Sequence, residues 1–242
     1  GDIVVTPSIM DVRIWSHARD TIGQRLLDAL QGQGVHHLLF VTSAADDRFR
    51  LGNYLLKTNA APSSIALPEK HFEPLQDLDH LRVWRLRSAG VRVFAASEQS
   101  GWRSLVAHNG QEISVSTEAS VIGRGPTIEV VNPDRTPFQL YSTDTFAIGE
   151  PGIILLVYAK TFRQSYVSIY SLEQDGQIAR PHMYRTTTWP AAVRGRDQAM
   201  WYADAYLLPV AGQRQYGIYV LGAEDLQQRF SDMACYFFAY PD

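Results

Sequence analysis

Apolar and polar positions in the first half of the chain alternate between short strand-like runs and stretches with helical spacing. Ile3 to Thr6 is a β-branched run that predicts a strand. Residues 35–42 form an almost continuous apolar run, typical of a strand buried on both faces of a sheet. Between these two strands, apolar residues at 22, 26, 29 and 30 share one helical face, and Gly32 ends the expected helix.

The next stretch predicts a second round of helix and strand. Phe49 to Leu56 is expected to be helical, and a short strand is expected at 65–67. Apolar residues from Phe72 to Ala89, mostly three positions apart, predict an amphipathic helix that Gly90 stops. Strands follow at 91–95, 104–108 and 112–117, and Asn109-Gly110 predicts a hairpin between the last two. The alternation predicts an α/β layered domain over residues 1–124.

Residues 125–242 lack helical periodicity except at 223–230, and they predict an all-β domain. Turn signals such as Asp175-Gly176 separate the apolar runs. This punctuation is typical of a β-sandwich. Tyrosines are dense here, and we expect most to pack in the core or across strands and a minority to belong to an interaction surface. The expected strands are 138–142, 153–160, 166–172, 177–184, 206–210, 216–221 and 233–240.

Composition narrows the functional classes. The chain has 242 residues with 45% hydrophobic and 19% charged residues, enough for a packed core. A net charge of −3 argues against a dedicated nucleic-acid binder. A single cysteine, Cys235, excludes an intramolecular disulfide, and its apolar surroundings predict a buried structural thiol. No apolar run is long enough for a membrane span, and the first residue, Gly1, suggests a piece excised from a longer chain.

Two segments of the first half, 81–94 and 102–117, together resemble one half of a phospholipase D-like phosphodiesterase. In that family, a hairpin strand carries a nucleophilic His and a phosphate-binding Lys, and an Asp and a Gly-Ser pair follow at fixed spacing. The spacing places these positions on Trp102, Ser104, Asn109, Ser116 and Thr117. The resemblance therefore implies a domain that has lost catalysis, since indole only donates hydrogen bonds and Ser104 carries no charge for phosphate.

Two segments of the second half, 146–158 and 166–178, resemble an uncharacterised bacterial immunoglobulin-like domain. That domain is often attached to envelope or secretion-linked proteins. The resemblance implies a periplasmic or cell-envelope location, with the cytoplasm as the alternative.

Other candidate chemistry lies in basic residues. Arg85, Arg92, Arg103 and His108 are candidates for contact with an anionic partner. His36-His37 alternates across a strand, so the pair does not predict a metal site, and no metal or other cofactor is expected.

Three functional hypotheses follow. The first is a non-catalytic interaction or assembly protein of a bacterial envelope or secretion apparatus, with protein partners. The second is a hydrolase with relocated chemistry at His108 or at His71 beside Lys70. The third is a binder of nucleic acid or lipid headgroups, of which nucleic acid is the less favoured. Phospholipase D-like sites combine two halves, so the resemblance also implies a homodimer.

Overall fold

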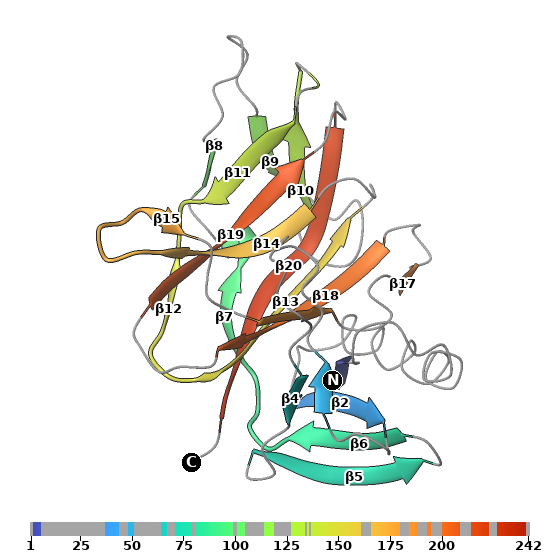
Figure 1. Ribbon diagram of the computed structural model, residues 1–242. Helices are drawn as coiled ribbons and strands as arrows, with labels where there is room; N and C mark the ends of the chain where they lie inside the picture. Colours follow the sequence, from blue (N-terminus) through green and yellow to red (C-terminus); the bar gives the residue numbers. More distant parts are fainter. Residues whose placement is uncertain are drawn as a thin grey trace.

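In the computed structural model, the described part of the chain consists almost entirely of strands (Figure 1). A small four-stranded sheet lies at one end, and two larger sheets stack beyond it. The chain is described at residues 2–5, 37–43, 48–50, 64–66, 71–78, 81–98, 101–104, 114–118, 127–133, 135, 137–160, 166–179, 184–187, 193–194, 200–208, 214–222 and 227–240.

The small sheet has the order β1-β2-β6-β5, with β1 parallel to β2 and the other neighbours antiparallel. Its last strand, β5, contains Pro74 and a register shift between Pro74 and Gln76. Proline and a bulge both suit a strand with only one neighbour, because they discourage further pairing. The bounds are β1 Asp2–Val5, β2 His37–Ser43, β5 Phe72–Leu78 and β6 Leu81–Leu86; a separate ribbon pairs β3 Arg48–Arg50 with β4 Ser64–Ala66.

The first large sheet, here called sheet I, contains eight strands in the order β16-β18-β13-β20-β10-β9, with β17 beside β18 and β7 beside β20. Its centre is β13, in which every residue from Gly152 to Lys160 is buried. A strand of this kind has both faces covered. The bounds are β7 Val91–Ala95, β9 Ser114–Glu118, β10 Thr127–Val131, β13 Gly152–Lys160, β16 Tyr184–Thr187, β17 Val193–Arg194, β18 Met200–Leu208 and β20 Gln227–Ala239.

The second large sheet, sheet II, contains six antiparallel strands in the order β15-β14-β19-β11-β8, with β12 also beside β19. Strand β19 is its centre, because β14 pairs along one side and β11 and β12 share the other. The bounds are β8 Trp102–Ser104, β11 Phe138–Ser142, β12 Phe146–Ile148, β14 Tyr166–Leu172, β15 Ile178–Ala179 and β19 Arg214–Gly222.

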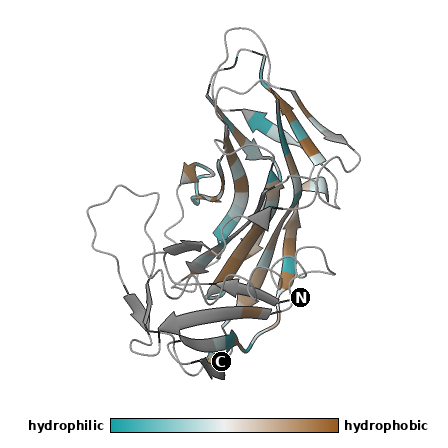
Figure 2. Cartoon of the chain, turned by 90° about the vertical axis from the view of Figure 1, so that its right-hand side faces the viewer, coloured by the Kyte–Doolittle hydropathy of each residue, from teal (hydrophilic) through white to brown (hydrophobic). Residues whose placement is uncertain are grey.

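One core lies between sheets I and II and makes them a β-sandwich. Every second residue of β13 enters it, among them Ile154 and Leu156, opposite Ile218 and Val220 of β19. Hydrophobic segments recur along the sandwich strands (Figure 2). Each fully buried side chain of this size, such as Phe138 or Phe230, contributes roughly 1.5–3 kcal/mol.

The longest strand, β20, links the two halves of sheet I. Along one side it pairs with all of β13, and along the other with β10 near its start and β7 near its end. Its register against β13 shifts near Tyr158, where Asp232 takes a left-handed backbone conformation with φ of 52°. Such a β-bulge bends the strand and increases its twist.

The small sheet meets the sandwich at a ring contact. His71, which precedes β5, stacks on Tyr240, which follows β20, with ring centroids 4.7 Å apart and an interplanar angle of 14°. The backbones of both residues are held by hydrogen bonds: Arg87 N–H donates to the His71 carbonyl at 3.0 Å, and Tyr240 N–H donates to the Pro151 carbonyl at 3.1 Å.

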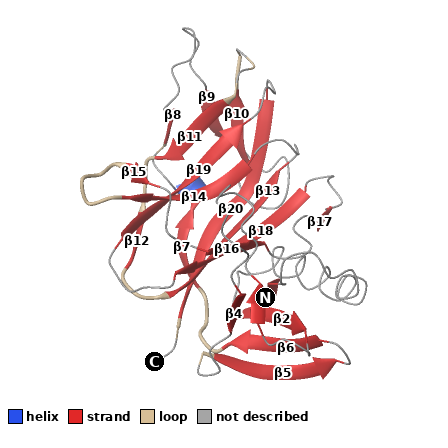
Figure 3. Cartoon of the chain, in the orientation of Figure 1, coloured by secondary structure: helices blue, strands red, loops and turns tan. Residues whose placement is uncertain are grey.

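The expected α/β layered domain is wrong. Within the described residues the one helical element is a single 3-10 turn, η1, Ala96–Glu98 (Figure 3). The helix expected at 72–89 is instead β5 and β6, and the bulge beside Pro74 shifts the apolar positions so that they imitate helical spacing. Residues 48–50 and 227–230 are also strand instead of helix, whereas the helix expected around 22–30 lies outside the described residues.

The expected hairpin between 104–108 and 112–117 falls mostly on residues 105–113, which lie outside the described residues. Strand β8 pairs with β11 of sheet II, and β9 pairs with β10 of sheet I. The described strands on either side of the expected turn at Asn109 therefore belong to different sheets, while the turn itself lies outside the described residues. The resemblance to a phospholipase D-like half is overturned, because that fold needs helical layers and the described residues are almost entirely strand.

The second half agrees better with the sequence. Strands β11 and β14 have the expected bounds, and β13, β19 and β20 extend the expected runs. A β-sandwich is compatible with the fold, and Cys235 is buried as expected. Strands β7, β8 and β9 precede residue 124 yet pair with sandwich strands, so the sandwich reaches back at least to Val91. The division at 124 itself stays a prediction. No helix among the described residues could cross a membrane.

Candidate functional site: a tyrosine face on sheet II

The outer face of sheet II, away from the core, carries a cluster of tyrosines. Strand register explains it: Tyr141 of β11 lies directly opposite Tyr219 of β19, while their neighbours Leu140 and Val220 point into the core. Side chains alternate between the two faces of a strand, so each inward aliphatic residue leaves the next residue outside. We call Tyr141, Tyr166, Tyr170 and Tyr219 the tyrosine face.

The four rings contact one another as a continuous group. Tyr141 meets Tyr170 edge-on at 5.3 Å and stacks on Tyr219 at 5.8 Å, centroid to centroid. Tyr166 meets Tyr219 at 6.0 Å with the ring planes 57° apart. Aromatic pairs favour these offset and tilted geometries, and each is worth about 0.5–1.5 kcal/mol beyond its burial. The rings are therefore held by each other.

Buried hydrogen bonds fix the inner half of the tyrosine face. The hydroxyl of Tyr170, which is 2% exposed, donates to the Ser142 carbonyl at 2.8 Å. Ser142 ends β11, and its Oγ accepts from the backbone N–H of Ile218 at 3.0 Å, which continues the pairing to β19 after the ladder stops. The hydroxyl of Tyr141 donates to Gln139 Oε1 at 3.0 Å.

A glycine creates the space for Tyr170. Gly217 lies directly opposite Tyr170 across the β14–β19 pair, and a Cβ at Gly217 would overlap the Tyr170 ring. The ring thus covers the bare backbone of Gly217, a cross-strand arrangement in which an aromatic residue compensates for glycine. The glycine at position 217 and the hydrogen bond to the Ser142 carbonyl therefore give the Tyr170 side chain one defined position.

The outer half of the tyrosine face reaches solvent. Tyr166 and Tyr219 are partly exposed, and beside them Leu221 is 38% exposed. Register places Leu221 between Gln139 and Tyr166 in a second row parallel to the first. The result is a surface of two tilted rings, one aliphatic side chain and one amide, with two buried tyrosines beside the rings on the same face.

Arg103 adds a positive charge at the end of the first row. It is exposed, and register places it opposite Tyr141, so Arg103, Tyr141 and Tyr219 stand side by side on β8, β11 and β19. Within the part of the chain that the structure describes, no carboxylate lies within ion-pairing distance of Arg103. Arg103 was a candidate binding residue from the sequence, and of the candidates that the structure describes it is the one that borders the tyrosine face.

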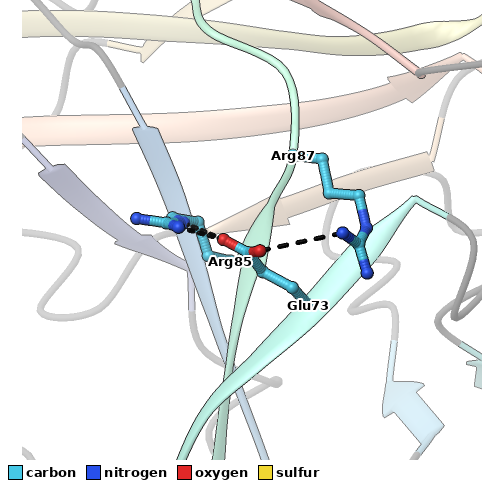
Figure 4. Close-up of polar contacts among 3 residues, drawn as sticks. All are labelled: Glu73, Arg85 and Arg87. Atoms are coloured by element: carbon cyan, nitrogen blue, oxygen red, sulfur yellow. Dashed lines mark hydrogen bonds and ion pairs between the residues drawn. The ribbon is translucent and has the colours of Figure 1, made fainter.

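The other candidate arginines lie elsewhere and have acidic partners. Arg85 of β6 forms an ion pair with Glu73 directly across the β5–β6 pair, and Arg87 approaches the second oxygen of Glu73 at 3.7 Å (Figure 4). The guanidinium of Arg92 in β7 donates a hydrogen bond to Glu98 Oε1 at 2.8 Å. The arginines that are close in sequence are thus distributed over three sheets and do not form one basic patch. His108 and Lys70 lie outside the described residues.

The positions that the resemblance to a phosphodiesterase singled out do not lie together in one site. Trp102 packs against the sandwich core, and Ser104 lies in sheet II opposite Leu140. Ser116 is exposed on sheet I opposite Glu129, which forms an ion pair with Arg229 at 2.8 Å. Thr117 follows on the same strand, opposite Ile128. Among the described residues, no group of three His, Cys, Asp or Glu side chains could hold a metal ion.

The sequence analysis noted the density of tyrosines but did not find the tyrosine face. Tyr158, Tyr206 and Tyr216 belong to the core, so tyrosine alone does not mark the surface. The available signal was alternation: Tyr219 sits between two inward aliphatic residues, and Tyr166 and Tyr170 are four apart on one strand face. To recognise from this alternation that the tyrosines form one face, the register of β14 against β19 must also be known, and the sequence does not supply it.

Comparison with known proteins gives only distant likenesses. No family model and no curated protein matches the chain. Among solved structures, the enzymatically active domain of tailspike protein 4 of bacteriophage CBA120 aligns with a TM-score of 0.38 and 13% identity, over 57% of this chain and 19% of that one. TmCBM61, in complex with β-1,4-galactotriose, aligns with a TM-score of 0.33 and 10% identity, over 57% and 89%. Neither likeness assigns a ligand or an activity to this chain.

Proposed function

We propose that this chain is a non-catalytic binding module and that the tyrosine face is its recognition surface. The observation that carries the proposal is the support of the partly exposed Tyr166 and Tyr219 by the buried, hydrogen-bonded pair of Tyr141 and Tyr170. Rings fixed before a ligand arrives lose little side-chain entropy on binding, which favours affinity. Tyrosine and arginine are also the residues most enriched at energetically dominant binding positions.

The surface suits binding by side chains. Both strands at its centre, β11 and β19, have neighbours on each side, so their backbone groups are engaged in the sheet. At these two strands a ligand therefore meets rings, an amide and a guanidinium, and no free sheet edge is available there for a partner strand to extend. A role within a bacterial envelope or secretion apparatus stays a prediction from the sequence.

The test is a binding panel with matched variants. Purified chain is applied to immobilised neutral and acidic polysaccharides, to anionic vesicles and to an array of acidic and neutral peptides. We expect at least one probe to bind, with binding lost in Tyr219→Ala and Tyr166→Ala. Leu75→Ala is the control, because Leu75 is 46% exposed on β5 of the small sheet and lies off the tyrosine face.

Three outcomes would count against the proposal. Binding that survives both tyrosine substitutions would place recognition elsewhere, and a panel in which no probe binds would remove the assigned role. Turnover of a phosphodiester or carboxylic-ester substrate by the purified chain would contradict the non-catalytic part. Near-ultraviolet circular dichroism of each variant distinguishes lost binding from lost folding.

A further inference from the structure

The chemistry around the tyrosine face indicates a class of ligand. We infer that it binds an oligosaccharide bearing carboxylate groups, with a sugar ring against Tyr219 and Tyr166 and a carboxylate at Arg103. This inference rests on the proposed function. Three features of the described residues support it: the tilt of the exposed rings, the neutral hydrogen-bonding groups around them, and the single unpaired cation at the end of the row.

The exposed rings suit a ligand with both apolar and polar surfaces. Tyr166 and Tyr219, 6.0 Å apart and 57° to each other, offer ring faces at two orientations. A sugar ring has one face of C–H groups, which packs on an aromatic ring, and a perimeter of hydroxyl groups, which needs hydrogen-bond partners. Ring-face packing alone gives a modest gain, so affinity also requires polar groups at the perimeter.

Those polar groups are present at the border of the tyrosine face. The Tyr219 hydroxyl makes no hydrogen bond to the part of the chain that the structure describes. Gln139 accepts the Tyr141 hydroxyl through Oε1, which leaves its amide N–H groups as donors toward the second row. Both groups are neutral: the Tyr219 hydroxyl can donate to or accept from ligand hydroxyls, and the Gln139 amide N–H groups can donate to them.

Charge decides between a neutral and an acidic sugar. By register, the outward positions of β8, β11, β19 and β14 around the tyrosines include Arg103 and no acidic residue. Neighbouring strands lie about 4.8 Å apart, so Arg103 stands about two strand spacings from Tyr219, within reach of a substituent on a stacked ring. A guanidinium binds a carboxylate through two parallel hydrogen bonds, which a neutral hydroxyl cannot replace.

A protein partner fits the same surface less well. Of the large hydrophobic residues that are exposed in the described chain, only Leu221 lies on this face, at 38%. A peptide docks either along a free strand edge or by anchors in a pocket, and Tyr141 and Tyr219 stand on β11 and β19, which are paired along both sides. An acidic peptide is therefore the competing outcome of the experiment.

The experiment compares each acidic sugar with its own neutral form. Oligosaccharides of galacturonate, alginate and hyaluronan are titrated into the intact chain by calorimetry, each beside its carboxyl-reduced counterpart. We expect at least one acidic form to bind about tenfold more tightly than its reduced form, the effect of one charge-assisted contact. Raising the salt concentration from about 50 to 500 mM should reduce that preference, because the contact is exposed to solvent.

Variants then assign the preference to Arg103. Arg103→Gln should abolish the difference between acidic and reduced forms while retaining the weaker binding of both. Tyr219→Ala should abolish binding of both forms. Arg92→Gln is the matched control, because Arg92 is an exposed arginine of sheet I that is paired with Glu98, and it should leave both affinities unchanged.

The outcomes separate this inference from the proposed function. Equal affinity for acidic and reduced forms, with binding lost in Tyr219→Ala, overturns the carboxylate assignment and leaves the tyrosine face as the binding surface. Binding to an acidic peptide but to none of the sugars, again dependent on Tyr219, overturns the ligand class. Sugar binding that is unaffected by Tyr219→Ala overturns both.

Discussion

Gly217 gives the sharpest test of how the tyrosine face is built. Gly217→Ala places a methyl group inside the volume of the Tyr170 ring. Overpacking of this kind costs about 1–3 kcal/mol. The displaced ring also loses its hydrogen bond to the Ser142 carbonyl, worth about 1 kcal/mol. Against these costs, alanine is favoured over glycine in a strand by roughly 0.5–1 kcal/mol. The net expected loss of unfolding free energy is about 1–3 kcal/mol.

The same substitution should reverse its sign when the ring is absent. In a Tyr170→Ala background neither the overlap nor the hydrogen bond remains, so Gly217→Ala should stabilise the chain by roughly 0.5–1 kcal/mol. Urea unfolding of the four proteins, followed by circular dichroism, measures the cycle. Gly149→Ala is the control, because a Cβ there has no neighbour within 4 Å. An equal cost of Gly217→Ala in both backgrounds would refute the role given to Tyr170.

Three further predictions concern the rest of the sandwich. The backbone at Asp232 is left-handed, which glycine tolerates and a β-branched residue does not. In thermal melts, Asp232→Gly should therefore leave the unfolding free energy unchanged or raise it by up to about 1 kcal/mol, whereas Asp232→Val should lower it by about 1–2 kcal/mol. Equal effects of both substitutions would contradict the bulge geometry. Burial raises the pKa of Tyr240 to about 12 from 10.0. Between about pH 10 and 12 the folded state therefore keeps a proton that the unfolded state loses, so the unfolding free energy should fall as the pH rises through this range. Urea unfolding midpoints should show a shallower fall in Tyr240→Phe. Burial also raises the pKa of the Cys235 thiol, so labelling by a thiol reagent should wait for unfolding, and rapid labelling of native chain would show that β20 opens locally.

The sandwich strands were largely predictable because their signals are local. Strand β14 combines a period-two pattern with the Asp175-Gly176 turn, and Gly176 does adopt a positive φ of 78°. There the Asp175 carboxylate accepts from the Gln177 N–H at 3.0 Å, as the turn residue requires. In β14, local pattern and turn chemistry agree, and the expected strand is found.

The N-terminal errors arose where local patterns conflict with pairing. The bulge at β5 changes the apolar spacing by one residue, and a shift of that kind makes a strand imitate a helical repeat. The strands that flank the expected hairpin, β8 and β9, have their partners in two different sheets, which the turn signal does not indicate. Partner choice over such sequence distances is absent from local patterns, and the tyrosine face depends on it as well, since it requires the β11–β19 and β14–β19 registers.

The position of β20 sets the order in which the chain matures during synthesis. Strands β7, β10 and β13 are all made before it, and each has backbone groups that only β20 pairs. At about 5–20 residues per second, β7 leaves the ribosome on the order of ten seconds before its partner is translated. During that interval the nascent chain carries open strand edges, which recruit other chains readily. Sheet I therefore closes only when translation has passed Ala239, and a nascent-chain holdase would matter most for this protein in the seconds before that point.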